Sequence, residues 1–123
     1  KKAVPPISAD FSALAADIED RKWILETFIR ESLKNKAELQ ESLSDMEMDF
    51  GRLRETLHRM YPVWEQLGIT HELEEYSEIL HDDGSDGDTV QRHTEEIIGR
   101  ICGLIAEAES LLSEMDNNRK RNI

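Results

Sequence analysis

Cysteine, glycine and proline are scarce in this sequence, and a long apolar run is missing. Cys102 is the only cysteine among 123 residues, so no disulfide can form within the chain and a reducing compartment is expected. Six glycines and three prolines, beside plentiful Glu, Leu, Lys, Arg and Ala, are typical of long helices or coiled coils. No apolar stretch approaches the roughly 18 residues that span a bilayer, and no secretory signal is visible.

Basic residues are also few. Lys and Arg number 15 against 27 Asp and Glu, which gives a net charge of -12. DNA, RNA and anionic membranes are polyanions, so we expect neither a nucleic acid nor a membrane as a partner. The charge favours a soluble, elongated surface. Because the first residue is Lys and not Met, we also expect a piece of a longer protein.

Apolar residues recur at helical spacing over most of the first half of the chain. The repeat marks the a and d positions of roughly eight heptads, and Lys22, Ser32 and Lys36 interrupt it. The pattern predicts one helix over about 8–67, after an extended leader at 1–7 that holds two prolines. The residues of this seam are expected to form a dimer interface or a core: Phe11, Ile18, Leu25, Ile29, Leu39, Leu43, Met46, Phe50, Leu53, Leu57, Met60, Trp64 and Leu67.

The stretch "YPVWEQLGIT" predicts a corner at the end of this helix. Pro62 removes a backbone donor and predicts a kink or break just before it. Gly68 is expected to end the helix in the left-handed conformation, with Ile69 folding back on the last turn. Thr70 then caps the next helix, and Trp64 fills the corner. The predicted corner residues are therefore Pro62, Trp64, Gly68 and Ile69.

Two shorter helices are predicted over 70–81 and 89–116, with a polar loop at 82–88 between them and a frayed tail at 119–123. Asp88 and Gln91 are expected to form a capping box for the last helix. Cys102 lies on the apolar stripe of that helix and is expected to be buried. The other residues predicted for the interface or core are Ile97, Ile101, Leu104, Ile105 and Leu111.

The length of the first predicted helix favours association of two chains. At ~1.5 Å per residue it would be roughly 85 Å long, which a compact globule of this size cannot bury. Two shorter helices cannot cover its whole stripe, so we predict a homodimer in which the long helix packs on a second copy. The predicted fold is therefore all-α: a long kinked helix followed by a helical hairpin, in a coiled-coil-like dimer. The alternative is a three-helix hairpin closed within one chain.

Metal and catalytic motifs are weak in this sequence. Glu55 with His58, and Glu78 with His81, have the Glu-x-x-His spacing of carboxylate-bridged dimetal bundles. The heptad pattern places the first pair outside the seam and His81 at a helix end, which favours surface residues. The loop at 82–88 lacks the glutamate that an EF-hand calcium loop needs at its twelfth position. We therefore predict no catalytic residue, metal or cofactor, and a protein that is not an enzyme; a dimetal helical protein is the alternative.

A resemblance reaches the second half of the chain. The stretch "LHRMYPVWEQLGI" (57–69) resembles the helix ending in Trp-Glu/Asp-x-Leu/Ile/Val-Gly near the N-terminus of the antiparallel microtubule bundlers. That family comprises animal protein regulator of cytokinesis, yeast anaphase spindle elongation protein and plant sixty-five-kilodalton microtubule-associated proteins. The stretch "HTEEIIGRICGLIAEAESLLSEM" (93–115) is similar to the family's next helix, in the same order along the chain.

The resemblance implies a dimerisation module of a non-motor crosslinker that bundles antiparallel microtubules in the spindle midzone during cytokinesis. It implies a second copy and a kinesin-4-type motor as partners, and microtubule binding through other parts of the full-length protein. It further implies a location in the cytoplasm and cytoskeleton, at the spindle midzone, with a nuclear location in interphase. The alternative is an unrelated coiled-coil adaptor or scaffold domain.

Overall fold

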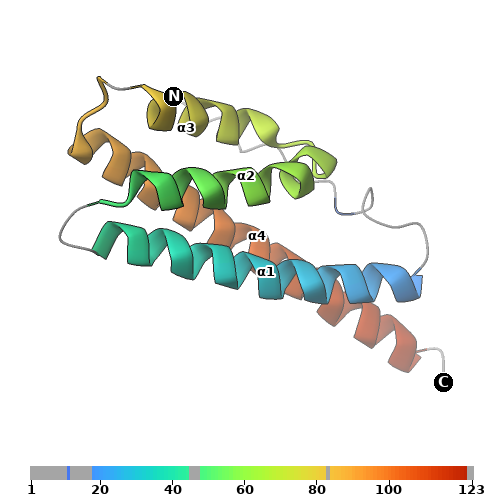
Figure 1. Cartoon of the computed structure of the whole chain (residues 1–123). Helices are drawn as coiled ribbons and strands as arrows, with labels where there is room; N and C mark the ends of the chain where they lie inside the picture. The colour runs from blue at the N-terminus through green and yellow to red at the C-terminus, as the bar shows by residue number, and fades with distance from the viewer. Residues whose placement is uncertain (1–10, 12–17, 45–47, 83, 122–123) are drawn as a thin grey trace, which may run out of the picture.

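The computed structural model describes residues 11, 18–44, 48–82 and 84–121, and it shows an all-α chain, as predicted (Figure 1). The helices are α1 (Ile18–Ser44), α2 (Phe50–Gln66), α3 (Thr70–His81) and α4 (Gly87–Arg121). Each packs on the helix that precedes it, and α1 also packs along α4. Successive helices run antiparallel (Figure 1), so these four form an up-down-up-down bundle that closes on itself.

The single helix predicted over 8–67 is wrong, because the chain reverses between α1 and α2. Asp49 begins α2: its backbone is not helical, and its side chain accepts a hydrogen bond from the Arg52 N–H at 3.0 Å. This is an N-cap, which starts a new helix in preference to continuing the old one. The Asp49 N–H also donates to the Ser42 carbonyl at 3.3 Å, so the end of α1 and the start of α2 are tied together.

The apolar seam that looked continuous therefore belongs to two helices that face each other. Leu25 and Leu39 of α1 share one buried cluster with Leu53 and Met60 of α2. The stripe is covered within the chain, so the premise from which we predicted a dimer no longer holds. The alternative prediction, a helical hairpin closed within one chain, agrees better with the observed packing, although the structure has four helices and not three. The dimer itself stays a prediction.

The corner after α2 forms as predicted at Gly68, which has a φ of 76°. The Gly68 N–H donates to the Glu65 carbonyl and the Ile69 N–H to the Trp64 carbonyl, at 3.0 and 3.1 Å. These two bonds are the Schellman arrangement, and Ile69 is fully buried behind it. No break occurs at Pro62, which lies inside α2 on its exposed side, where water can reach the carbonyl that lost its partner.

The boundaries of the last two helices agree with the predicted ones only in part. α3 spans Thr70–His81 as predicted, but Ile69 is its N-cap and no side chain caps it, so the predicted Thr70 cap is wrong. The predicted capping box at Asp88 is also wrong. Asp86 accepts the Thr89 N–H at 2.7 Å instead, and this backbone hydrogen bond lowers the pKa of Asp86. α4 begins at Gly87 and continues beyond residue 116, where we expected it to end, to Arg121.

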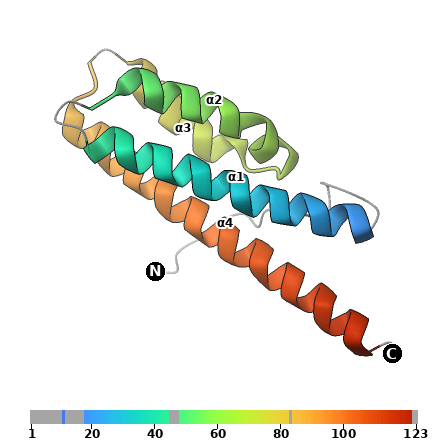
Figure 2. The ribbon, with the colours of Figure 1, turned by 60° about the horizontal axis from the view of Figure 1, so that its bottom comes forward.

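Unequal helix lengths let α1 and α4 extend beyond the other two helices at one end of the bundle. α1 and α4 have 27 and 35 residues, about 40 and 52 Å at ~1.5 Å per residue, whereas α2 and α3 have only 17 and 12. The α2–α3 hairpin lies over the part of the pair where α1 ends and α4 begins (Figures 1 and 2). The first turns of α1 and the last turns of α4 therefore run on beyond the hairpin (Figure 2).

A buried hydrogen bond joins α3 to α4 inside the core. The Tyr76 hydroxyl lies 2.7 Å from Thr94 Oγ1, and Thr94 Oγ1 in turn donates to the Val90 carbonyl at 2.7 Å. Because the Thr94 hydroxyl has only one hydrogen, Tyr76 must be the donor of the first bond. Within the part of the chain that the structure describes, no buried side-chain nitrogen or oxygen lacks a partner. The buried polar side chains of the described core therefore all have hydrogen-bond partners.

Candidate interaction surface

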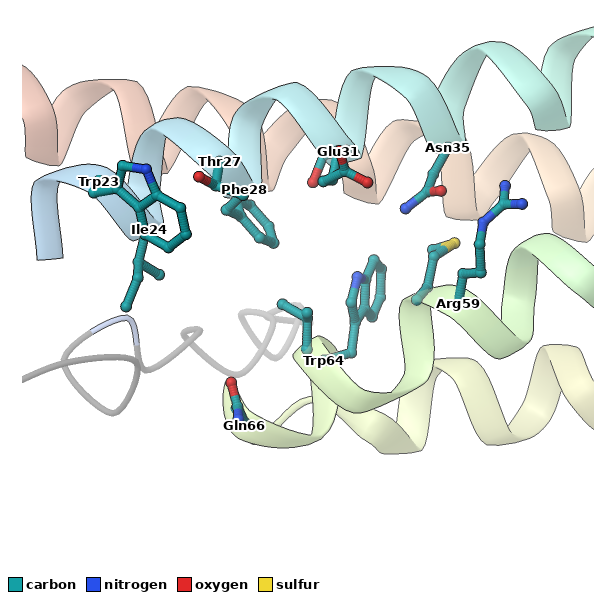
Figure 3. Close-up of a pocket in the computed structure, with 12 residues that line it drawn as sticks. Trp23, Ile24, Thr27, Phe28, Glu31, Asn35, Arg59, Trp64 and Gln66 are labelled. Atoms are coloured by element: carbon teal, nitrogen blue, oxygen red, sulfur yellow. The ribbon is translucent and has the colours of Figure 1, made fainter. Parts of the chain in front are cut away.

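An apolar groove of about 440 Å³ lies between α1 and the end of α2 (Figure 3). Phe28 of α1 and Trp64 of α2 point into the space between the two helices (Figure 3), and both are buried. The full lining consists of Trp23, Ile24, Thr27, Phe28, Glu31, Ser32, Asn35, Arg59, Met60, Val63, Trp64 and Gln66. The volume lies in the lower half of the 300–1,000 Å³ that is usual for ligand sites.

The rim of this groove carries unusually exposed apolar side chains. Trp23 is 64% exposed and Val63 is 36% exposed, and both line the groove. Leu33, at 49%, is the other large hydrophobic residue exposed on the described surface, and it does not line the groove. Trp23 and Trp64 are the two tryptophans of the chain, so one groove holds both. Tryptophan is among the residues most enriched at the energetic centres of protein interfaces.

The two charged side chains in the lining differ in their partners. Arg59 forms an ion pair with Glu38, and this hydrogen bond lowers the pKa of the Glu38 carboxyl. Glu38 also accepts a hydrogen bond from the Thr56 hydroxyl at 3.2 Å. Glu31 forms no ion pair with any residue for which the structure gives a side chain. The unneutralised charge in the groove is therefore negative.

An aromatic contact supports the floor of the groove. The Phe11 ring packs edge-on against the Phe28 ring, with centroids 5.3 Å apart and an interplanar angle of 79°. Both rings are buried, and this arrangement is a favoured one for aromatic pairs. Phe28 is thus held by a residue far from it in the sequence.

The structure places the residues predicted for an interface or core mainly in the core of this one chain. Among the predicted corner residues, Ile69 is buried while Pro62 and Gly68 are exposed. Met46 and the side chain of Ile18 lie outside the described part. The half-buried members are Ile29, Leu43, Phe50 and Leu111. The buried members are Phe11, Leu25, Leu39, Leu53, Leu57, Met60, Trp64, Leu67, Ile97, Ile101, Leu104 and Ile105.

Cys102 is exposed, so its predicted burial is wrong. Its neighbours Ile101 and Leu104 face the core, and the helical turn carries Cys102 to the outward side of α4. The sequence misled because the apolar stripe of this helix is wide and Cys102 stands at its edge.

The two Glu-x-x-His motifs come partly together. α2 and α3 bring His58 and His81 to a ring-centroid distance of 6.4 Å, while Glu55 and Glu78 stay exposed. The His81 Nδ1 atom lies 2.8 Å from the carbonyl of Ser77, in its own helix. Across the described residues, no three His, Cys, Asp or Glu side chains are placed to hold a metal ion.

A smaller polar cleft of about 260 Å³ lies between α3 and α4. Arg100 of α4 contacts Glu72 of α3 across it at 3.0 Å, and His93 contacts Glu96 within α4 at 3.1 Å. The cleft is therefore a place where two helices are joined, and it lacks the apolar lining of the groove between α1 and α2.

Trp23 and Phe28 are the aromatic residues of the groove that the sequence analysis missed. Both stand outside the a and d registers, so the heptad pattern gave them no role. The available signal was the presence of two large aromatic residues, five positions apart, outside the seam of one helix.

Comparison with known proteins found no match to the chain among protein-family models, curated proteins or solved structures. The resemblance to the microtubule bundlers therefore rests on residues 57–69 and 93–115 alone. None of the described helices combines the length and apolar character that crossing a membrane requires.

Proposed function

We propose that this chain is an assembly module, a helical bundle that binds other protein chains and does not catalyse a reaction. The observation that carries the proposal is Trp23, a large aromatic residue 64% exposed beside an apolar groove, on a bundle whose core is otherwise closed. Most of the indole surface lies in water at this site and so contributes little to the packing of the described helices. Bound against a partner, the same indole would bury a large apolar area.

The groove suits the insertion of side chains from a helix. Its floor is formed by Phe28, Met60 and Trp64, which are at least nine-tenths buried and so present a fixed shape. Its polar ends, among them Asn35 and Gln66, can bond groups that border an apolar anchor. A groove between two helices that accepts the apolar face of a third is a recurrent mode of peptide recognition.

Selection from an unbiased library of displayed helical peptides tests this function. We expect the enriched binders to lose at least about tenfold in affinity, roughly 1.4 kcal/mol, on Trp23→Ala. The matched control is Leu33→Ala, which removes an exposed apolar side chain from the same helix outside the groove. Failure to enrich any binder, or binders that ignore Trp23→Ala, would refute the assembly function.

We further propose a narrower function, a homodimer within an antiparallel microtubule crosslinker of the spindle midzone, with a kinesin-4-type motor as another partner. The observation in its favour is the corner at Trp64, Gly68 and Ile69, which carries the resemblance and forms a rigid helix end. The net charge of -12 agrees with microtubule binding by other parts of a longer protein, because microtubules are acidic.

Sedimentation equilibrium at micromolar concentration tests the dimer, and co-sedimentation of the full-length protein with microtubules tests the crosslinker. We expect twice the mass of one chain, and bundling that is lost when residues 1–123 are deleted. A single-chain mass would refute the dimer. Bundling that survives the deletion would refute the role in crosslinking.

A further inference from the structure

We propose that the groove between α1 and α2 binds the apolar face of a basic amphipathic helix from a different protein. This inference rests on the proposed assembly function and adds the chemistry of the partner. Bulky apolar side chains of the partner would lie between Trp23 and Trp64, and a Lys or Arg beside them would reach Glu31.

The shape of the site favours a helix as the occupant. α1 continues past the end of α2, so the groove is bordered by an uninterrupted helix on one side and closed by the corner after Gln66 on the other (Figure 3). A partner helix laid there would extend the antiparallel packing that the bundle already uses. Its apolar residues would recur every three or four positions, as helix-in-groove ligands require.

The charge of the site favours a basic partner. Within the lining, the cation of Arg59 is already neutralised by Glu38, whereas Glu31 has no ion pair among the described residues. Glu65, next to Trp64, is also exposed. The excess of 27 acidic over 15 basic residues adds a negative field around the whole chain. Such a field attracts a cationic partner and speeds its encounter with the groove.

The same charge argues against a second copy of this chain in the groove. Each copy carries -12, so charge repulsion disfavours a second copy as the occupant of this acidic groove, and the proposed dimer would use another face. A Glu31 carboxylate without a partner would also meet a predominantly acidic surface. A different, basic protein avoids both costs.

Three synthetic helices of about 18 residues test the proposal, a length that remains helical once bound. The first has Leu on one face and Lys on the other, the second has Glu in place of Lys, and the third has Ser in place of Leu. Binding is read from the fluorescence of Trp23 and Trp64, which are the two tryptophans of the chain and both line the groove. We expect the Leu/Lys helix to bind at least about tenfold more tightly than either of the others.

Single substitutions test whether the Leu/Lys helix binds in the groove. Trp23→Ala should reduce the affinity for the Leu/Lys helix at least about tenfold, with Leu33→Ala as its control. Glu31→Gln should reduce the affinity by about twofold to fivefold and weaken its dependence on salt, because one screened ion pair is lost. The control for that change is Glu26→Gln, an exposed glutamate of α1 outside the groove. These four side chains are exposed or line an open groove, and circular dichroism verifies that each variant folds.

Several outcomes would overturn the inference, and they differ from those that refute the assembly function. Equal binding of the Leu/Glu helix, with Trp23→Ala still harmful, would leave an assembly groove but remove the preference for a basic partner. Equal binding of the Ser/Lys helix would mean that charge alone attracts the peptides. A dimer that Trp23→Ala dissociates would place a second copy in the groove.

Discussion

At the scale of single residues, the two tryptophans have opposite environments at one site. Trp64 is 2% exposed and belongs to the core, whereas Trp23 is 64% exposed. We predict that Trp64→Ala lowers the free energy of unfolding by ~3–5 kcal/mol, since a large cavity forms. Trp23→Ala should change it by less than about 0.5 kcal/mol, as surface substitutions do. Urea unfolding followed by circular dichroism measures both. A loss below about 1 kcal/mol for Trp64→Ala would contradict its placement in the core.

Tyr76 gives the core a pH dependence at high pH. Burial raises the pKa of Tyr76 from 10.0 to about 12, because the charged phenolate would lose its contact with water. The folded state thus holds this proton more tightly than the unfolded state does. The stabilisation is complete below pH 10 and is lost as the pH rises toward 12, by an amount on the order of 2–3 kcal/mol.

The variant Tyr76→Phe tests this dependence. At pH 7 we predict a loss of ~1 kcal/mol in the free energy of unfolding, because one net hydrogen bond to Thr94 disappears. Between pH 10 and 12 the wild type should lose this advantage and become the less stable of the two proteins, because the variant has no phenol to ionise. If the difference between the two proteins is constant across that range, Tyr76 is not the titrating group.

At the scale of the helices, two glycines differ in whether the fold requires them: Gly68 forms a turn that needs glycine, and Gly103 lies in a helix that does not. Gly68 has a φ of 76°, which side chains rarely adopt, whereas Gly103 stands inside α4 with no atom within 4 Å of where a Cβ would lie. We predict that Gly68→Ala destabilises the fold by ~1 kcal/mol. The same substitution at Gly103 should stabilise it by up to ~1 kcal/mol, because alanine favours the helix.

Thermal unfolding of the two variants measures both changes. Destabilisation by Gly103→Ala would show that a contact of α4 requires a bare backbone there, and it would contradict the exposure of Gly103 in the structure. A neutral Gly68→Ala would show that the corner adjusts easily, and then it could not be a rigid helix end.

Helix boundaries show which local signals were sufficient. The end of α2 at Gly68 was predictable because glycine is the residue that most readily adopts a left-handed cap. The start of α2 at Asp49 was not predicted, although Asp is a common N-cap, because the apolar register runs unbroken across it. Pro62 was expected to interrupt α2, and the exposed position of that residue removed the reason for an interruption.

At the scale of the whole molecule, the closed bundle changes the expected result of seam substitutions. If α1 formed a dimer seam, Leu25→Glu would weaken association more than Leu73→Glu. Both residues are instead fully buried in the one core, so we predict that both variants unfold the chain to a similar degree. The cause is the same in each case, an ionised carboxylate placed in an apolar interior. Circular dichroism and sedimentation of the two variants measure it. A folded Leu25→Glu monomer would restore the dimer seam.

The all-α fold class, the charge, the apolar seam and the corner at Gly68 could all be predicted from the amino-acid sequence. Those features depend on local chemistry: helical periodicity, ionisable groups and the backbone freedom of one glycine. Which helix the apolar seam of α1 packs against became known only from the tertiary structure. A heptad pattern states which side chains are turned away from water, and the pattern is the same whether the opposing helix belongs to the same chain or to a second one. The tertiary structure also decided the groove, because Trp23, Phe28 and Trp64 meet only when the chain reverses between α1 and α2.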